Sequence, residues 1–380
     1  MRIVYCTDSV CYQGGIQCVT IAKANALAEI PGNQVWIIVA DHLKDSIAEL
    51  NSKVQLLNLQ VNYSEDDWKG KLYVLKGILI KRRIHKKRMK QVLSQIQPDI
   101  VISTGTSEKY FLPEIKLESK PVFIREIHFF KGYRTASAKN LFQKALAFLG
   151  DFYDYKVKIH SYSKIVVLTN EDKTNNWKDE DNILVIPNPN TAETSYKSSA
   201  SSKIVIAAGR LCSQKNFSSL LRIWKKVNQQ CPDWKLQIFG EGEEKQKLIN
   251  TIQELSLNDS VALMGYSSEI HRNMSEASIF TLTSFFEGFG LVIVEAMSVA
   301  LPVISYACPC GPKDIITDGV DGYLIEPNDE NSFAQKITYL IKDKEKRITM
   351  SNNALIKSSN YSLDEVINNW MIFFNMIRNH

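Results

Sequence analysis

Short apolar runs alternate with longer mixed segments along the whole 380-residue chain. The first run, residues 3–6, is followed by a segment with helical spacing at residues 16–30 and by a second run at residues 35–40. Continuous apolar runs predict strands buried on both faces of a parallel sheet, and the mixed segments predict the helices that cover it. Further strands are expected at residues 54–57, 100–103, 122–127 and 165–168.

The same alternation begins again near residue 204, after a serine-rich segment that predicts an interdomain linker. A capping box at Ser362 and Glu365 then predicts a C-terminal helix with an apolar face. We therefore expect an α/β protein with a first domain at 1–190, a linker at 191–202, a second domain at 203–361 and a final helix at 362–380. In the second domain we expect strands at 204–208, 235–239, 261–264, 279–283 and 302–305. Helices are expected at 217–229 and 243–255.

Composition places the chain among folded proteins, since 44% of its residues are hydrophobic and 23% are charged. No apolar stretch reaches the roughly 18 residues needed to cross a bilayer, and the first residues show no signal-peptide pattern. We therefore expect a cytoplasmic protein. Seven cysteines without a Cys-x-x-Cys pair indicate a reducing compartment, and Cys308 and Cys310 are expected to be ordinary loop thiols.

The net charge of +5 is unevenly distributed. Between Trp68 and Pro98 every charged residue is basic, and apolar residues precede most of the charges. This segment predicts either a basic amphipathic helix that lies on anionic lipid or a solvated helix face, and both interpretations stay open. Nucleic acid is not expected as a partner.

The second domain contains a pattern that carries chemistry. The apolar run 279–283 leads into Ser284-Phe285-Phe286-Glu287-Gly288-Phe289-Gly290, and the residues from Leu291 onward have helical character. At such a helix start the backbone amides are unpaired and glycine lets a phosphate approach closely, so the loop is a candidate anion site. Glu287 in the loop and Glu295 in the helix add acceptors for sugar and ribose hydroxyls.

The pattern Ser-x-x-Glu-Gly-Phe-Gly-Leu-x-x-x-Glu-Ala-Met around Glu287 and Glu295 resembles the signature of the retaining glycosyltransferases of family 4, the glycosyl transferases group 1. The similarity extends to the Gly-Arg-Leu…Lys-Asn segment at 209–216 and to residues 240–242, 302–304, 311–316 and 318–325. It implies the GT-B fold, in which two Rossmann-like domains face each other across a cleft and the C-terminal helix crosses back to the first domain.

The resemblance also implies a role for each matching residue. Arg210 and Lys215 match the cations that neutralise the donor diphosphate, so no metal and no cofactor beyond a nucleoside diphosphate sugar are expected. Glu287 matches the catalytic carboxylate beside the transferred sugar, and Glu295 matches the residue that binds the ribose. Backbone contacts to the phosphates and the nucleobase are implied for Phe289, Gly290, Leu291, Gly265 and Tyr266.

Two features of the first domain are weaker matches. Gly14 and Gly15 form a glycine turn between the first strand and the first helix, which either approaches the donor or the acceptor or is a structural turn. His128 matches a catalytic histidine that touches the donor sugar, although Phe129 and Phe130 depart from the residues that usually follow it.

The implied activity is transfer of a sugar from a nucleoside diphosphate, with uridine expected as the nucleoside, to a hydroxyl of a glycan, with retention at the anomeric carbon. A lipid-linked precursor of lipopolysaccharide, capsule or another bacterial surface glycan is the expected acceptor, with peripheral contact to an anionic membrane. Two alternatives remain: a nucleotide-sugar epimerase of the same fold, and a non-catalytic protein that binds sugar nucleotides.

Overall fold

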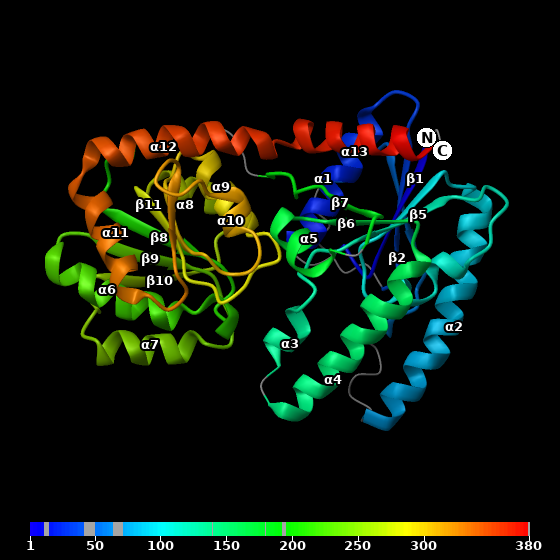
Figure 1. The fold of residues 1–380 in the computed structure, drawn as a ribbon, viewed down its shortest axis with the longest axis horizontal. Coiled ribbons are helices and arrows are strands. Elements are labelled where there is room, and N and C mark those ends of the chain that lie inside the picture. The colour runs from blue at the N-terminus through cyan, green and yellow to red at the C-terminus, as the bar shows by residue number, and fades with distance from the viewer. Residues whose placement is uncertain are drawn as a thin grey trace. The chain divides into compact units, whose positions relative to one another are not determined.

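The computed structural model describes residues 1–10, 15–41, 50–63, 71–138, 140–178, 180–191 and 195–378. The chain divides into two compact units. The first unit comprises Met1–Leu168, Asn175–Pro189 and Leu363–His380, and the second comprises Thr169–Thr174 and Asn190–Ser362. Each unit contains one sheet with helices packed against it (Figure 1).

The sheet of the first unit has seven strands among the described residues, in the order β3-β2-β1-β4-β5-β6-β7, and all neighbours are parallel. Its strands are β1 (Arg2–Thr7), β2 (Gln34–Val39), β3 (Val54–Asn58), β4 (Ile100–Ser103), β5 (Val122–Glu126), β6 (Lys164–Val167) and β7 (Ile183–Val185). Wherever the apolar runs predicted a strand, the structure has one within two residues. The three-residue strand β7 was not predicted, because it is too short to show a pattern.

The helices of the first unit include α1 (Gly15–Glu29), the long α2 (Lys71–Ile96), α3 (Tyr133–Ser137), α4 (Leu141–Phe152), the π-helical turn η4 (Tyr153–Lys158) and α13 (Leu363–Arg378). Ile21, Leu27 and the apolar residues of α13 join one core cluster on the sheet, while Met89 and Leu93 of α2 join another. Two helical layers therefore bury the sheet from both sides, as its apolar strands require.

The second unit repeats this architecture with six parallel strands in the order β10-β9-β8-β11-β12-β13. The strands are β8 (Ile204–Ala208), β9 (Lys235–Phe239), β10 (Val261–Gly265), β11 (Ile279–Leu282), β12 (Val303–Tyr306) and β13 (Gly322–Ile325). The helices are α5 (Asn170–Asn176), which the division between the units cuts, and α6 (Phe217–Gln230), α7 (Lys245–Glu254), α8 (Ile270–Ser275), α9 (Leu291–Ser298), α10 (Pro312–Ile315), α11 (Glu330–Lys342) and α12 (Lys344–Ser358).

The serine-rich segment near the start of the second unit is hydrogen-bonded to the rest of that unit. The Ser198 amide donates to Val299 O at 2.8 Å, and the Arg347 guanidinium donates to Ala200 O at 2.9 Å. Ala200 is buried. The serine-rich segment from Ser195 onward therefore packs against the second unit, and hydrogen bonds to its backbone hold it there.

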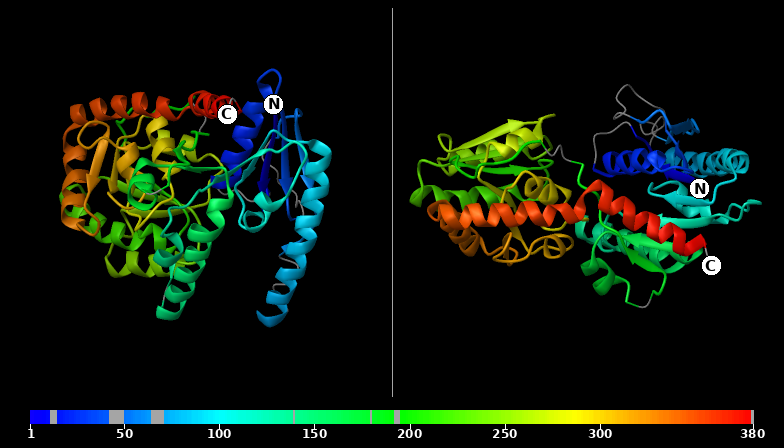
Figure 2. Two further views of the ribbon diagram at one scale, coloured as in Figure 1. Left: turned by 45° about the vertical axis from the view of Figure 1, so that its right-hand side comes forward. Right: turned by 90° about the horizontal axis from the view of Figure 1, so that it is seen from above.

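The last helix, α13, belongs to the first unit although it follows the helices of the second (Figure 2). Val366, Ile367, Trp370, Phe373 and Phe374 are all buried in the first unit's core. Their spacing follows one face of a helix, which explains the apolar face seen in the sequence. None of the helices in the described part of the chain is long and apolar enough to span a membrane.

Trp370 is the largest buried side chain of α13, with ring contacts to both Phe373 and Phe374. We expect Trp370→Ala to lower the free energy of unfolding by about 3–5 kcal/mol, because it leaves a cavity that the sheet cannot fill. Urea denaturation of the whole chain measures the effect. Ile372→Ala is the control on the same helix, since this side chain is 50% exposed. Equal losses in the two variants would contradict the packing described for α13.

Candidate functional site

The glycine-containing loop of the second unit joins β11 to α9. Strand β11 lies beside β8 at the centre of the sheet, where the strand order reverses. The loop therefore emerges next to Gly209 and Arg210, which follow β8. Ligands of open α/β sheets bind at this position, outside the carboxyl ends of the central strands.

A largely buried ion pair lies at the base of this loop. Lys215 Nζ is 2.8 Å from Glu287 Oε1, and the two side chains are only 16% and 7% exposed. Burial lowers the pKa of Lys215, but the adjacent Glu287 carboxylate outweighs burial and holds this pKa above its ordinary value. Two residues that the sequence marked as separate candidates thus form one charged pair.

The loop is attached on one side to the turn that carries Lys215. The Phe285 amide donates to Gln214 O, and Gln214 Nε2 donates to Phe286 O, both at 2.9 Å. The Thr283 hydroxyl lies 3.2 Å from Lys215 O and from Asn216 O. The lysine and the glutamate are therefore fixed by backbone contacts as well as by their own attraction.

On the other side the loop is attached to residues 309–311. The Glu287 amide donates to Pro309 O at 2.7 Å, and the Cys310 amide donates to Glu287 O at 3.2 Å. Gly311 has φ +114°, and a Cβ there would lie 1.8 Å from Phe289 O. Only glycine permits this approach. The sequence matched this segment to the family without indicating that it supports Glu287.

Helix α9 begins at Leu291, directly after Gly290, whose φ is +88°. Glycine has no side chain to cap the first amides of the helix, so they are available to an anion. Ser284 Oγ is buried and has no hydrogen-bond partner among the described residues, so it keeps hydrogen-bonding capacity in the same loop. This arrangement fits the phosphate contacts expected of Phe289, Gly290 and Leu291.

Glu295 lies in the second turn of α9, with its side chain 18% exposed. His271 Nε2 of α8 is 4.0 Å from Glu295 Oε1. The sequence did not indicate His271, because nothing in its neighbourhood resembles a motif and the two residues meet only through the fold.

The remaining donor-site candidates follow strands β8 and β10. Arg210 is 73% exposed, and its Nη2 is 3.3 Å from Glu243 Oε2. Gly265 has φ +76°, and its carbonyl accepts a hydrogen bond of 2.8 Å from the Gly240 amide. Tyr266 is 60% exposed. Arg210 therefore lies at the surface, in contrast to the buried Lys215, and the structure pairs the two cations with different carboxylates.

Two candidates belong to the first unit. Gly15 starts α1, whereas Gly14 lies outside the described residues. His128 is buried and lies two residues after the end of β5 at Glu126. Its Nε2 is 3.4 Å from Glu126 Oε1. Lys23 of α1 forms a buried ion pair with the same carboxylate oxygen. Burial lowers the pKa of His128 to about 4, against the opposing effect of Glu126, so this imidazole is neutral near pH 7.

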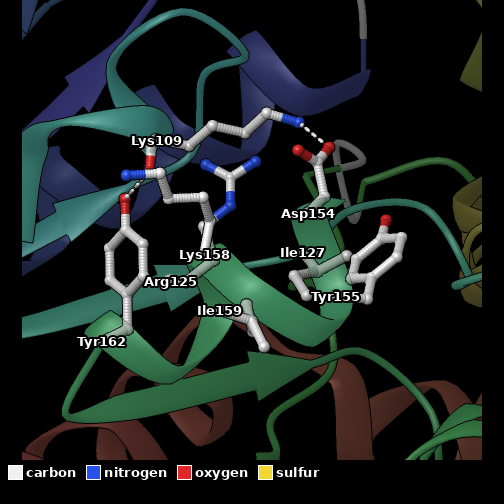
Figure 3. A pocket seen from close by; sticks show the side chains of 8 residues that line it. All are labelled: Lys109, Arg125, Ile127, Asp154, Tyr155, Lys158, Ile159 and Tyr162. Atoms are coloured by element: carbon white, nitrogen blue, oxygen red, sulfur yellow. Dashed lines mark hydrogen bonds and ion pairs between the residues drawn. The ribbon is translucent and has the colours of Figure 1, made fainter. Parts of the chain in front are cut away.

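A small polar pocket of about 30 Å³ also lies in the first unit, with room for about one water molecule (Figure 3). Lys109 and Asp154 pair across it at 2.5 Å. Burial, together with the charge of Arg125, lowers the pKa of Lys109 to about 8. Arg125 donates to Ser103 and to Gly105 O. These cations are engaged within the fold, so the pocket has no spare charge for an anion.

No group of three or more His, Cys, Asp or Glu side chains that could hold a metal ion occurs among the described residues. Cys308 and Cys310, the close pair in the sequence, are free thiols. Burial raises the pKa of Cys310 to about 12. At neutral pH this thiol is protonated, so it is a poor nucleophile.

The close approach at Gly311 leads to a stability prediction. We expect Gly311→Ala to cost more than about 3 kcal/mol, because the new Cβ combines an unfavourable φ with a backbone clash. Gly319 provides a control, since its φ is +74° but no atom lies within 4 Å of an added Cβ. Gly319→Ala should cost about 1 kcal/mol. Urea denaturation tests both variants, and similar losses would show that the contact with Phe289 is unimportant.

The low pKa of His128 makes stability depend on pH. The ordinary pKa is 6.5 and the folded value is about 4, so the unfolded chain binds more protons between these values. Stability should therefore fall as the pH drops from 6.5 towards 4, by up to about 1.4 kcal/mol per pH unit for this group. His128→Asn should reduce that slope, whereas His160→Asn, at an exposed position, should not. Unchanged slopes in denaturation at several pH values would contradict the burial of His128.

With the geometry established, comparison with known proteins identifies the second unit. Residues 191–356 match the family model described as glycosyl transferases group 1. Over 227 residues the chain is 33% identical to the amylovoran biosynthesis glycosyltransferase AmsD of Erwinia amylovora, a match that covers 57% of this chain and 64% of AmsD. The chain spans less than two thirds of the length of the first curated relatives it matches.

Similar solved structures cover almost the whole chain. Sucrose-phosphate synthase from Thermosynechococcus elongatus superimposes with a TM-score of 0.83 at 17% identity, covering 100% of this chain and 99% of that one. A variant of TarM from S. aureus gives a TM-score of 0.75 at 16% identity, with 98% and 99% coverage. The expected GT-B fold and the family resemblance are both confirmed: the chain has the GT-B fold, and residues 191–356 match the model of the glycosyl transferases group 1.

Proposed function

We propose that this protein transfers a sugar from a uridine diphosphate sugar to a hydroxyl group of a glycan, with retention at the anomeric carbon and without a metal. The observation that carries the proposal is the largely buried ion pair between Lys215 and Glu287 of the glycine-containing loop. It places a cation and a carboxylate 2.8 Å apart beside the uncapped start of α9. A diphosphate and the sugar attached to it need these two charges side by side.

In the proposed reaction the bond between the anomeric carbon and the diphosphate oxygen breaks, and a bond to the acceptor oxygen forms. The acceptor proton leaves with the departing diphosphate. Lys215, the α9 amides and the exposed Arg210 stabilise the negative charge that develops on the leaving group. Glu287 stabilises the positive charge on the sugar. The ion pair with Lys215 favours this electrostatic role over covalent attack, because a neutralised carboxylate is a weaker nucleophile.

The remaining candidates take the roles that the family resemblance implies. Glu295 accepts from the ribose hydroxyls, and Gly265 and Tyr266 lie against the base. His128 is neutral near pH 7, and its two ring nitrogens have no hydrogen-bond partner among the described residues. It is therefore suited to hydrogen-bond a sugar hydroxyl without adding charge.

Retention of configuration is supported by the chemistry of a structural neighbour. The TarM structure holds UDP together with alpha-GlcNAc-glycerol. Because the sugar in common UDP donors is α-linked, an α-linked product implies retention. We extend this outcome to the present chain because the pattern around Glu287 and Glu295 resembles that of the retaining family.

For the acceptor we propose a lipid-linked precursor of a bacterial surface glycan, such as lipopolysaccharide or capsule, used at the cytoplasmic face of the membrane. A relative named for amylovoran biosynthesis and the basic helix α2 support this choice. Peripheral contact with anionic lipid would bring the enzyme to such an acceptor.

The central test compares Glu287→Ala and Glu287→Gln with the unaltered protein. We expect UDP to raise the melting temperature of all three, since the phosphate contacts remain, while sugar transfer from UDP-glucose or UDP-GlcNAc to an alkyl glycoside falls by about 10²-fold or more. Glu295→Ala, in the helix that follows the loop, is the matched control and should weaken UDP binding instead. Normal turnover in both Glu287 variants would overturn the assignment.

The same assay separates the alternatives. Incubation with the sugar nucleotide alone would yield an epimerised donor if the protein were an epimerase. Binding of UDP without any transfer or epimerisation would indicate a protein that only binds sugar nucleotides. Transfer that persists in EDTA is expected, and strict dependence on added Mg²⁺ or Mn²⁺ would contradict the cationic role given to Lys215 and Arg210.

A further inference from the structure

Helix α4 of the first unit is amphipathic, and its large apolar side chains are exposed. None of its twelve residues, all of which the structure describes, is buried. The exposed fractions of its six large apolar side chains all lie between 53% and 85%. These side chains are Leu141, Phe142, Leu146, Phe148, Leu149 and Phe152.

The polar side of α4 is the side that contacts the protein. Asp151 accepts from Arg134 of α3 at 3.3 Å, and a Cβ added to Gly150 would lie 3.2 Å from the same guanidinium. Phe142 and Leu149 point away from Asp151 by helical spacing, since they lie nine and two residues before it. A surface helix of an ordinary soluble domain has the reverse arrangement. The apolar face of α4 is therefore directed away from the first unit's core.

Helix α2 supplies positive charge close by. It carries nine basic and no acidic residues, and Arg83, Lys87 and Lys90 are exposed. Leu79 and Ile80 on the same helix are 57% and 59% exposed. Figures 1 and 2 show α2 and α4 extending from the same edge of the first unit.

A basic pocket of about 310 Å³ lies between α2 and the turn η4, which directly follows α4. Arg82, Arg83 and Lys86 of α2 line one side, and Tyr153, the first residue of η4 directly after α4, lines another. The Arg82 guanidinium lies 4.5 Å from the centre of the Tyr110 ring. Glu114 is the acidic residue of the lining, and it pairs with Lys86 and Lys158. The pocket therefore carries excess positive charge next to the apolar helix.

Three occupants could cover an apolar face of this kind: a second copy of the chain, another protein or a lipid bilayer. A second copy docked through α4 would bring the cations of two α2 helices towards each other, which like-charge repulsion opposes. A bilayer with acidic phospholipids matches both features, because it offers an apolar interior to α4 and phosphates to α2.

We propose that the first unit docks on an anionic bilayer, with the apolar face of α4 at the boundary between headgroups and acyl chains and the α2 pocket on lipid phosphates. The inference rests on the proposed function for its membrane-bound acceptor. It adds the apolar face of α4 to the basic helix α2, so that the docking surface consists of two helices. Apolar insertion and charge then contribute separately and can be removed one at a time.

Sedimentation with vesicles tests the proposal on the full-length protein. We expect binding to vesicles of phosphatidylglycerol and phosphatidylcholine at low salt, with at least ten-fold weaker binding to pure phosphatidylcholine. Phe148→Ser with Leu149→Ser should weaken binding to the anionic vesicles at least ten-fold. Arg83→Glu with Lys87→Glu should abolish the preference for anionic lipid and most of its dependence on salt.

Matched controls lie in the second unit. Ile348→Ser with Ile356→Ser removes apolar side chains that are 37% and 70% exposed, and Lys342→Glu with Lys344→Glu reverses exposed charges. Both controls should bind vesicles as the unaltered protein does. The melting temperature with UDP shows that every variant is folded and retains its donor site, so a failure here is distinguishable from a failure of the transferase assignment.

Two outcomes would overturn the proposal. One is vesicle binding by the α4 and α2 variants that equals that of the controls. The other is a dimer in light scattering that the Phe148→Ser and Leu149→Ser variant converts to a monomer, since a second copy would then be the occupant of α4.

Discussion

The ion pair between Lys215 and Glu287 is the constraint around which the glycine-containing loop of the second unit is arranged. A carboxylate in a buried loop is costly unless a cation reaches it. Gly209 leaves room beside Lys215, as a Cβ there would lie 3.1 Å from the lysine side chain. Gly311 permits the matching approach on the other side of the loop. Glycines of two segments that match the family thus lie where the chain packs closely around the ion pair.

The sequence was sufficient for the strands and for most of the second-unit site, because both are local patterns. Buried parallel strands appear as continuous apolar runs, and the 284–290 loop sits between a strand and a helix that can each be recognised. What the sequence could not supply were contacts between segments far apart in the chain. The partner of Glu287, the hydrogen bonds of Pro309 and Cys310, and the position of His271 near Glu295 all arise from the order of strands in the sheet.

Helix α4 shows a different limit. Its apolar side chains have the spacing of a core-facing helix, and hydrophobic periodicity alone assigns such a face to the interior. In the structure Asp151 on the polar side contacts Arg134 of α3, and the large apolar side chains are left exposed. The spacing of apolar residues therefore predicts that one face of a helix is covered. It does not predict whether the protein's own core covers that face.

The core of the first unit concentrates unused hydrogen-bonding capacity around His128. Glu126 Oε2, both nitrogens of His128 and the Tyr5 hydroxyl have no partner among the described residues, although all are buried. Each such group costs roughly 1–3 kcal/mol relative to a satisfied one. Lys23 offsets part of this cost by pairing with Glu126, and its charge adds to the burial that keeps His128 neutral. A neutral imidazole with free nitrogens is poorly explained by stability alone, and hydrogen bonding to a sugar hydroxyl would satisfy it.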